Sequence, residues 1–164
     1  MKVFISHKRE DGEKARAIAL RLKQIHLIDS YLDVIDPLIG AHDGPALAEH
    51  VQNQMNGCDS LLAVVSSATV NSQWVPWEIG IATEKRFPLA TFANTLMPLP
   101  EFLQKWPYLK SDSDLDKYAK VLNQIKSKAR TAVLSRSYTS ESFNQTIRSA
   151  ESEFYKNIKA ELGR

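Results

Sequence analysis

The sequence of 164 residues has little cysteine, no long apolar run and little excess charge. Cys58 is the only cysteine, which excludes a disulfide framework and a thiolate metal cluster and fits a reducing cytoplasm. No apolar stretch approaches the ~18 residues that span a bilayer, and the run at residues 1–6 is too short for a secretory signal. The net charge of +2 gives no strong attraction to nucleic acid or to a membrane. The length and average composition predict one globular domain over residues 1–164.

Charge is distributed unevenly along the first sixty residues. Residues 1–30 carry seven Lys or Arg and four Asp or Glu, whereas residues 31–60 carry five acidic residues and no Lys or Arg. Such an acidic segment is either a solvated face or an interaction surface. Oppositely charged faces would suit head-to-tail association of identical chains.

The first half of the chain alternates short apolar runs with helical patterns. Buried strands are predicted at residues 3–5, 31–35, 61–65 and 89–92. Helical spacing of apolar residues predicts a helix from Ala15 to Ile25, a second one opening at Gly44-Pro45, and a third beginning near Trp74. This order predicts an α/β fold, with a doubly wound parallel sheet of four to five strands flanked by helices.

After residue 94 this rhythm stops, and a proline-rich segment containing Pro98, Pro100 and Pro107 follows. No convincing fifth strand is visible there, but two helices are predicted, one starting after capping-type residues at 111–114 and one from about Ser140. Their apolar faces are formed by Leu115, Tyr118, Ala119, Leu122 and Ile125, and by Phe143, Ile147, Ala150, Phe154 and Ile158. We therefore divide the domain into a βα core at residues 1–94 and a helical C-terminal region at residues 95–164.

Ligands of open parallel sheets bind outside the carboxyl ends of the strands, which here are followed by the loops 6–12, 36–44 and 66–72. These loops and the helix after them supply the candidate site residues Ser6, His7, Lys8, Arg9, Asp43, Trp74 and Glu78. None of these groups has metal-ligand spacing, and the sequence contains no glycine-rich phosphate loop. Ser6 and His7 are neighbours at a strand end and point in different directions, so they are not expected to form a nucleophile–base pair.

Trp74 and Glu78 are four residues apart and therefore share one face of the third helix. In one interpretation Trp74 belongs to the core and Glu78 is an ordinary acid of the first turn, favoured by the helix dipole. In the other, a carboxylate beside an indole at the carboxyl edge of the sheet has a chemical role.

Three segments together resemble a TIR (Toll/interleukin-1 receptor) domain of the type that consumes NAD⁺. Residues 3–9 resemble the first strand and its loop, and residues 31–34 with 36–45 resemble the second strand and the long loop after it. The pattern Trp74-x-x-x-Glu78 resembles the W-x-x-x-E signature of the third helix. The resemblance covers roughly residues 1–92.

The resemblance implies a flavodoxin-like sheet and cleavage of the nicotinamide–ribose bond of NAD⁺, a substrate, with no further cofactor and no metal. Glu78 matches the catalytic glutamate of the family and Trp74 its aromatic companion. Ser6, His7 and Arg9 match positions that line the nucleotide cleft. Asp43 lies in the loop that closes over the site or contacts the next subunit.

A short chain of this kind also resembles the signalling subunit of anti-phage systems such as Thoeris, in which the nucleotide product activates a separate effector protein. The sequence thus leaves two functions open. One is an NAD⁺ glycohydrolase or ADP-ribosyl cyclase of cytoplasmic antiviral defence, and the other is a non-catalytic module for TIR–TIR association.

Overall fold

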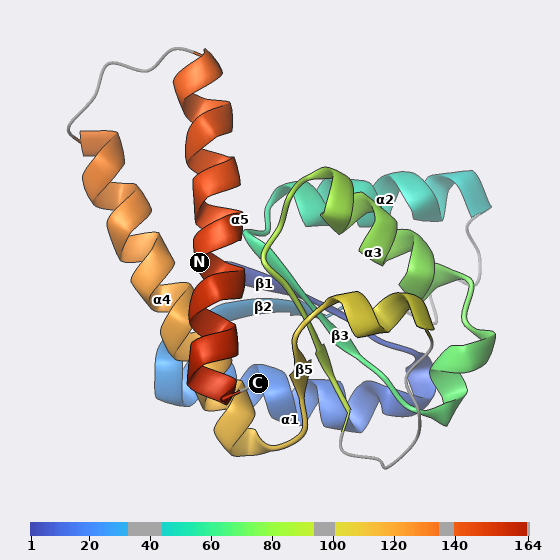
Figure 1. The fold of residues 1–164 in the computed structure, drawn as a ribbon. Helices are drawn as coiled ribbons and strands as arrows, with labels where there is room; N and C mark the ends of the chain where they lie inside the picture. Colours follow the sequence, from blue (N-terminus) through green and yellow to red (C-terminus); the bar gives the residue numbers. More distant parts are fainter. Residues whose placement is uncertain (33–43, 94–100, 135–139, 164) are drawn as a thin grey trace.

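The protein is built around one parallel β-sheet with helices on both faces, as the computed structural model in Figure 1 shows. The structure describes residues 1–32, 44–93, 101–134 and 140–163. The strands are β1 (Lys2–Ser6), β2 (Asp29–Leu32), β3 (Ser60–Val64), β4 (Leu89–Phe92) and β5 (Tyr108–Leu109). The helices are α1 (Gly12–His26), α2 (Gly44–Asn56), α3 (Trp74–Glu84), α4 (Asp112–Leu134) and α5 (Ser140–Leu162), with short 3₁₀ helices at Arg9–Asp11, Ser67–Asn71 and Glu101–Lys105.

The strand order is β2-β1-β3-β4-β5, and all four neighbouring pairs are parallel. This is the flavodoxin-like order, so the predicted fold class is confirmed. The prediction of no fifth strand was wrong. β5 has only two residues and follows Pro107, too short for a periodic signal, and it is defined by pairing with β4 rather than by its own pattern.

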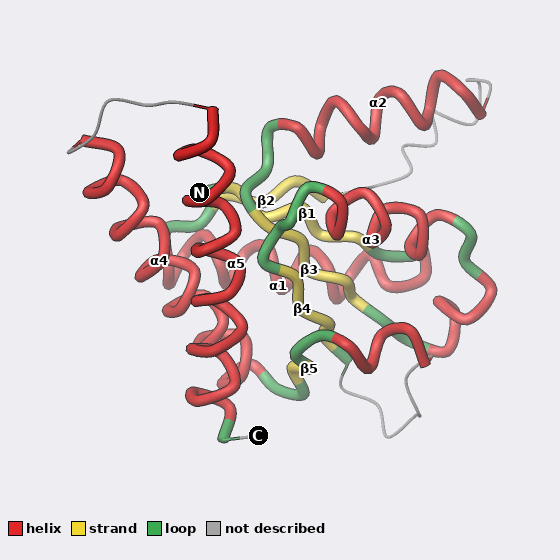
Figure 2. The backbone as a smooth tube through the Cα atoms, turned by 45° about the horizontal axis from the view of Figure 1, so that its top comes forward, coloured by secondary structure: helices red, strands yellow, loops and turns green. Residues whose placement is uncertain are grey.

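Side chains of successive strand residues point to opposite faces of the sheet, which creates two cores. Val3 and Ile5 belong to the core beneath α1, α4 and α5, whereas Phe4 belongs to the core beneath α2 and α3. Figure 2 shows the sheet between these two layers of helices. The alternation in β1 therefore places Ser6, two residues after Phe4, on the face covered by α2 and α3.

The C-terminal helices are part of the α1 layer. All five predicted core residues of α4 are buried, and so are Phe154 and Ile158 of α5. The side chains of Phe143 and Ile147 lie outside the described residues. Ala150 is partly buried and packs against the same core, so the apolar faces predicted for these two helices are turned toward the sheet and α1 wherever the structure describes their side chains.

One detail of the predicted helices differs from the structure. Ile25 was expected on the apolar face of α1 but is largely exposed, because it lies in the last turn, just before Leu27 ends the helix with a left-handed backbone. Cys58 lies two residues beyond α2, where it is nevertheless buried. Burial raises the pKa of its thiol to about 11, so this cysteine is not an activated nucleophile.

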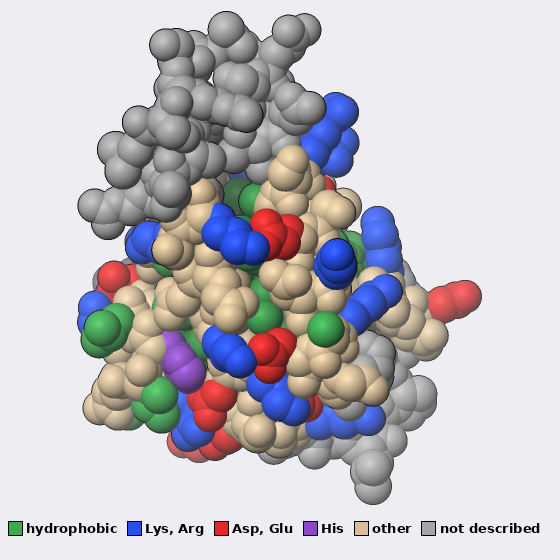
Figure 3. Space-filling model, turned by 60° about the vertical axis from the view of Figure 1, so that its left-hand side comes forward, with side chains coloured by type: hydrophobic (Ala, Val, Ile, Leu, Met, Phe, Trp, Pro, Cys, Tyr) green, Lys and Arg blue, Asp and Glu red, His purple; other side chains and the backbone are tan. Residues whose placement is uncertain are grey.

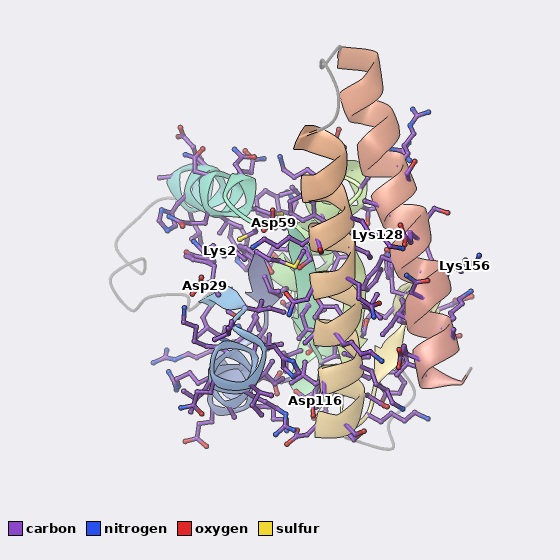
Figure 4. The ribbon with its side chains drawn as sticks, turned by 90° about the vertical axis from the view of Figure 1, so that its left-hand side faces the viewer. Lys2, Asp29, Asp59, Asp116, Lys128 and Lys156 are labelled. Carbon is purple, nitrogen blue, oxygen red and sulfur yellow. The ribbon has the colours of Figure 1, made fainter. Side chains whose placement is uncertain are left out.

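Polar contacts fix α4 to α1, as Figure 4 shows with Asp116 between the two helices. Asp116 accepts hydrogen bonds from Arg21 Nε at 2.9 Å and Nη2 at 2.6 Å, and it lies 2.8 Å from His26 Nε2. The hydrogen bond from Arg21 contributes most to lowering the pKa of Asp116 below its usual value near 3.8, and His26 adds to it. His26 thus has a structural role, since its ring contacts Asp116 where α1 meets α4.

Asp116→Asn is expected to lower the free energy of unfolding at neutral pH. That free energy should also change less with pH in the variant than in the wild type. The pKa of this carboxyl is lower in the folded state, so its contribution is present above about pH 4 and is lost as the pH falls through the folded pKa. The effect should be modest because the side chain is one-third exposed. Urea unfolding of both proteins at pH 7 and pH 3 tests this, with the exposed Glu13→Gln as control; equal pH dependence would contradict it.

Candidate functional site

The candidate site lies where the ends of β1 and β3 meet at the carboxyl edge of the sheet. These strands are neighbours, yet the chain leaves β1 toward α1 on one face and leaves β3 toward α3 on the other. Such a reversal of direction opens a crevice between the two loops in doubly wound sheets. The position agrees with the edge predicted from the sequence.

Glu78 is directed into the protein from α3, and its side chain has no exposed surface. It belongs to the inward stripe of this helix, together with the buried Val75, Ile79 and Ala82. Burying a carboxylate at a core position of a helix destabilises the protein unless polar groups form hydrogen bonds with it. The interpretation of Glu78 as an ordinary solvated acid of the first turn is therefore not supported.

Ser6 supplies a polar group that meets this carboxylate. Its hydroxyl, also without exposed surface, donates a hydrogen bond to Oε2 of Glu78. The two residues are 72 positions apart in the sequence and are brought together because Ser6 points toward the α3 face of the sheet. The structure thus joins two of the sequence-predicted residues.

Trp74 opens α3 one turn before Glu78 and is partly buried. Its ring packs edge-on against Trp77, with centroids 5.4 Å apart and an interplanar angle of 87°. Trp77 in turn packs against the core beneath α2 and α3. The start of the helix is fixed by Ser72, whose Oγ accepts from the backbone N–H of Val75 at 3.2 Å. Pro76 lies in the first turn, where its missing N–H leaves no helical hydrogen bond unmade.

His7 and Arg9 lie in the loop after β1 but differ in their surroundings. His7 is 5% exposed, and its Nδ1 is 3.0 Å from the carbonyl oxygen of Ile5. Arg9 is exposed in the 3₁₀ helix before α1. Ser6 and His7 have separate hydrogen-bond partners, as expected for neighbours that point in different directions. Asp43, together with the acidic Asp33 and Asp36, lies outside the described residues.

The sequence analysis missed a second connection between the loops after β1 and β3. Ser66 Oγ donates to Asp11 Oδ2 at 2.8 Å and also accepts from the backbone N–H of Ala68 at 3.1 Å. Thr69 completes a capping box with Ser66. Ser66 directly follows the buried strand run at residues 61–65, so its position at the carboxyl edge was a usable signal.

The described parts of the chain offer neither a metal site nor a membrane-spanning helix. Within those ranges no group of three or more His, Cys, Asp or Glu is arranged to hold a metal ion. None of the described helices combines the length and apolar character needed to cross a membrane.

A groove of about 720 Å³ lies away from this site, along α4 between the end of α1 and the end of α5. Lys117 and Lys120 line it together with Asp116 and Glu161. Figure 3 shows basic and acidic side chains interspersed on this side of the molecule. The mixed charge gives the groove no clear preference for an anionic ligand.

Comparisons with known proteins agree with this architecture. The family model described as TIR domain matches residues 3–125, which extends from β1 into α4. The TIR domain of the Toll-related receptor TRR-2 from Hydra magnipapillata superposes with a TM-score of 0.52 and 17% identity, over 65% of this chain and 81% of that one. A 2-deoxyribosyltransferase from Bacillus psychrosaccharolyticus superposes with a TM-score of 0.58 and 11% identity, over 72% of this chain and 92% of that one.

At these identities the two solved structures establish the fold alone. A search of curated protein sequences finds no match. The family model covers three quarters of the chain, including the whole sheet and the helix that carries Glu78. This chain therefore belongs to the TIR domain family.

Proposed function

We propose that this protein cleaves the nicotinamide–ribose bond of NAD⁺, with Glu78 as the catalytic carboxylate. The observation that carries this proposal is the inward-facing carboxylate of Glu78, received by Ser6 where the ends of β1 and β3 meet. TIR domains include NAD⁺-cleaving enzymes and non-catalytic modules. A module used only for association gains nothing from a carboxylate at a core position, since an apolar side chain there would be less costly.

One carboxylate is sufficient for this reaction. Nicotinamide leaves the ribose as a neutral molecule, so no acid has to protonate it, in contrast to glycosidases that use two carboxyl groups. As the C–N bond breaks, positive charge develops on the ribose, and a nearby carboxylate stabilises it and holds the ribose hydroxyls. Capture of the cation by water gives ADP-ribose, and capture by an atom of the same nucleotide gives a cyclic isomer.

The remaining site residues are proposed to hold the dinucleotide. Trp74 presents an aromatic surface one turn before Glu78, and His7, buried directly after β1, is proposed to contact the nucleotide once the site opens. The exposed guanidinium of Arg9 can form a charge-assisted pair with the pyrophosphate. Asp43 keeps the role that the family resemblance implies, in the loop near the site or at the next subunit. The 2-deoxyribosyltransferase offers a likeness of fold only.

The activity is proposed to depend on association of chains. Glu78 has no exposed surface, so a ribose reaches its carboxylate only after the site opens. TIR domains associate through TIR–TIR contacts, and binding of a second chain could supply the free energy for opening.

The rate of NAD⁺ cleavage per chain is therefore expected to rise at least about tenfold as the protein is concentrated into assemblies, since linked equilibria of this kind shift with chain concentration. Initial rates over a wide dilution series, with light scattering at each concentration, measure this dependence. A constant rate per chain from a protein that stays monomeric would contradict it.

In the cell, the product is proposed to act as an antiviral signal that a separate effector protein recognises, and the enzyme to work in the cytoplasm. The lone buried Cys58 with its raised pKa is compatible with a reducing compartment. This placement rests on the resemblance to Thoeris-like systems and is a step beyond the enzymatic proposal.

Product analysis tests the proposal. Concentrated protein is incubated with NAD⁺ under crowding conditions, and the nucleotides are separated by chromatography with mass detection. Release of nicotinamide with ADP-ribose would identify a hydrolase, and an isomer of cyclic ADP-ribose would identify a cyclase. Intact NAD⁺ both with purified protein and in lysate of phage-infected cells would favour the non-catalytic TIR module instead.

A further inference from the structure

The hydroxyl of Ser6 is turned toward Glu78 rather than toward solvent. Ser6 has no exposed surface, and its Oγ donates to Glu78 Oε2. The family resemblance places Ser6 among residues that contact the nucleotide. A side chain that is buried and already bonded to the carboxylate is better suited to act on Glu78 than on the substrate.

The backbone that carries Ser6 is held on both sides. β1 lies between β2 and β3, and Ser6 pairs with Ala63 in the parallel ladder. Directly after the strand, the contact between His7 Nδ1 and the carbonyl oxygen of Ile5 holds the turn of the chain. A hydroxyl on such a central strand is a rigid donor, which a loop residue would not be.

The backbone that carries Glu78 is also fixed, in this case by the packing of α3 on the sheet. Val75 and Ile79, both buried, flank it on the inward stripe of α3 and pack against the sheet. The orientation of the carboxylate itself depends on rotation about the last side-chain bonds. A hydrogen bond from Ser6 restricts this rotation and favours the ionised form of the carboxyl group.

We propose that Ser6 is a positioning residue that orients the Glu78 carboxylate and favours its ionised form, and that it does not bind the substrate itself. This inference rests on the proposed function of Glu78. It predicts that loss of the hydroxyl weakens the chemical step while leaving nucleotide binding nearly unchanged.

Ser6→Ala is the variant that tests it. We expect kcat for NAD⁺ cleavage to fall about tenfold or more, as for loss of a hydrogen bond to a charged group, with KM changing less than about twofold. The rise of kcat with pH should move to higher pH, because the carboxyl group loses a donor that favours its charged form. Ser6→Cys keeps a similar volume and a weaker donor, so its kcat should lie between those of Ser6→Ala and the wild type.

Ser60→Ala is the matched control. Ser60 is also fully buried in a central strand of the same sheet, but its hydroxyl lies 3.5 Å from that of Tyr118 on the opposite face. The substitution therefore removes a buried serine hydroxyl that does not contact Glu78. Its kcat and pH profile should match those of the wild type.

A second readout does not need activity. The carboxyl ¹³C signal of Glu78 is titrated by NMR in the wild type, Ser6→Ala, Ser6→Cys and Ser60→Ala, and the pKa of Glu78 should be highest in Ser6→Ala. The NMR titration tests the effect of Ser6 on Glu78 even if the protein does not cleave NAD⁺. Failure of the proposed function can therefore be distinguished from failure of this inference. An unchanged pKa of Glu78, a selective rise in KM, or a higher kcat in Ser6→Ala would each overturn the proposal.

Discussion

Glu78→Gln is expected to lower kcat/KM for NAD⁺ cleavage by roughly 10²- to 10³-fold or more while the protein remains folded. The amide has nearly the size of the carboxylate, and its carbonyl oxygen can still accept the hydrogen bond from Ser6, so the packing of α3 should persist. What is lost is the negative charge that faces the developing cation of the ribose. Electrostatic contributions of a single preorganised group at the reacting centre have this magnitude. Nicotinamide release measured under steady-state conditions gives the ratio.

Glu84→Gln is a matched control on the same helix. Glu84 is the last residue of α3 and is exposed, so the same change of one carboxylate to an amide there should leave kcat/KM within about twofold. If Glu78→Gln retained wild-type activity with NAD⁺, the assignment of Glu78 would be wrong. The buried carboxylate would then need a purely structural explanation.

Phe154→Ala is expected to destabilise the protein by about 3–5 kcal/mol. Phe154 lies on α5 without exposed surface, and its ring packs edge-on against those of Tyr118 and Tyr155, with centroids 5.9 and 5.2 Å away. Truncation leaves a cavity between α4, α5 and the sheet and removes these contacts. Urea unfolding followed by circular dichroism measures the change in the free energy of unfolding.

Phe154→Ala tests whether the C-terminal helices unfold in the same cooperative transition as the sheet. Lys156→Ala, two residues along α5 and on its exposed outer side, is the control and should change stability by less than about 0.5 kcal/mol. A loss below about 1 kcal/mol in Phe154→Ala, or a separate early transition for α5, would mean that residues 95–164 form an appendage to the βα core.

Local pattern predicted most of the fold, because each strand and helix of the first half carries its own periodicity. The run at residues 61–65 is continuously apolar and the run at 89–92 is apolar except for Thr91, as expected for strands buried on both faces, and the structure has β3 and β4 there. The second strand begins two residues earlier than predicted, at Asp29. The sequence is polar there, and these residues belong to the strand because they pair with β1. β5 was missed for the same reason, since two residues contain no period.

The sequence pointed to the candidate edge of the sheet and to Glu78, whose catalytic role stays a prediction, but it did not predict the contacts that Glu78 makes. Spacing shows that Trp74 and Glu78 share a helix face, and it does not show that this face is turned inward. The hydrogen bond from Ser6 to Glu78 depends on the neighbouring positions of β1 and β3 and on the alternation that puts Ser6 on the α3 side. Both are properties of the tertiary arrangement, so a pattern along the chain could not reveal that Ser6 meets Glu78.

The central claim, that the edge between β1 and β3 receives the nicotinamide half of NAD⁺, is tested most directly by mapping where the dinucleotide binds. NAD⁺ is titrated into isotope-labelled Glu78→Gln protein, which should bind without turnover, and the amide shifts are followed by NMR. We expect the largest changes in amide chemical shift at Ser6, His7 and the first turns of α3. Changes confined to the groove along α4, or no binding at millimolar NAD⁺ at chain concentrations where light scattering shows association, would contradict it.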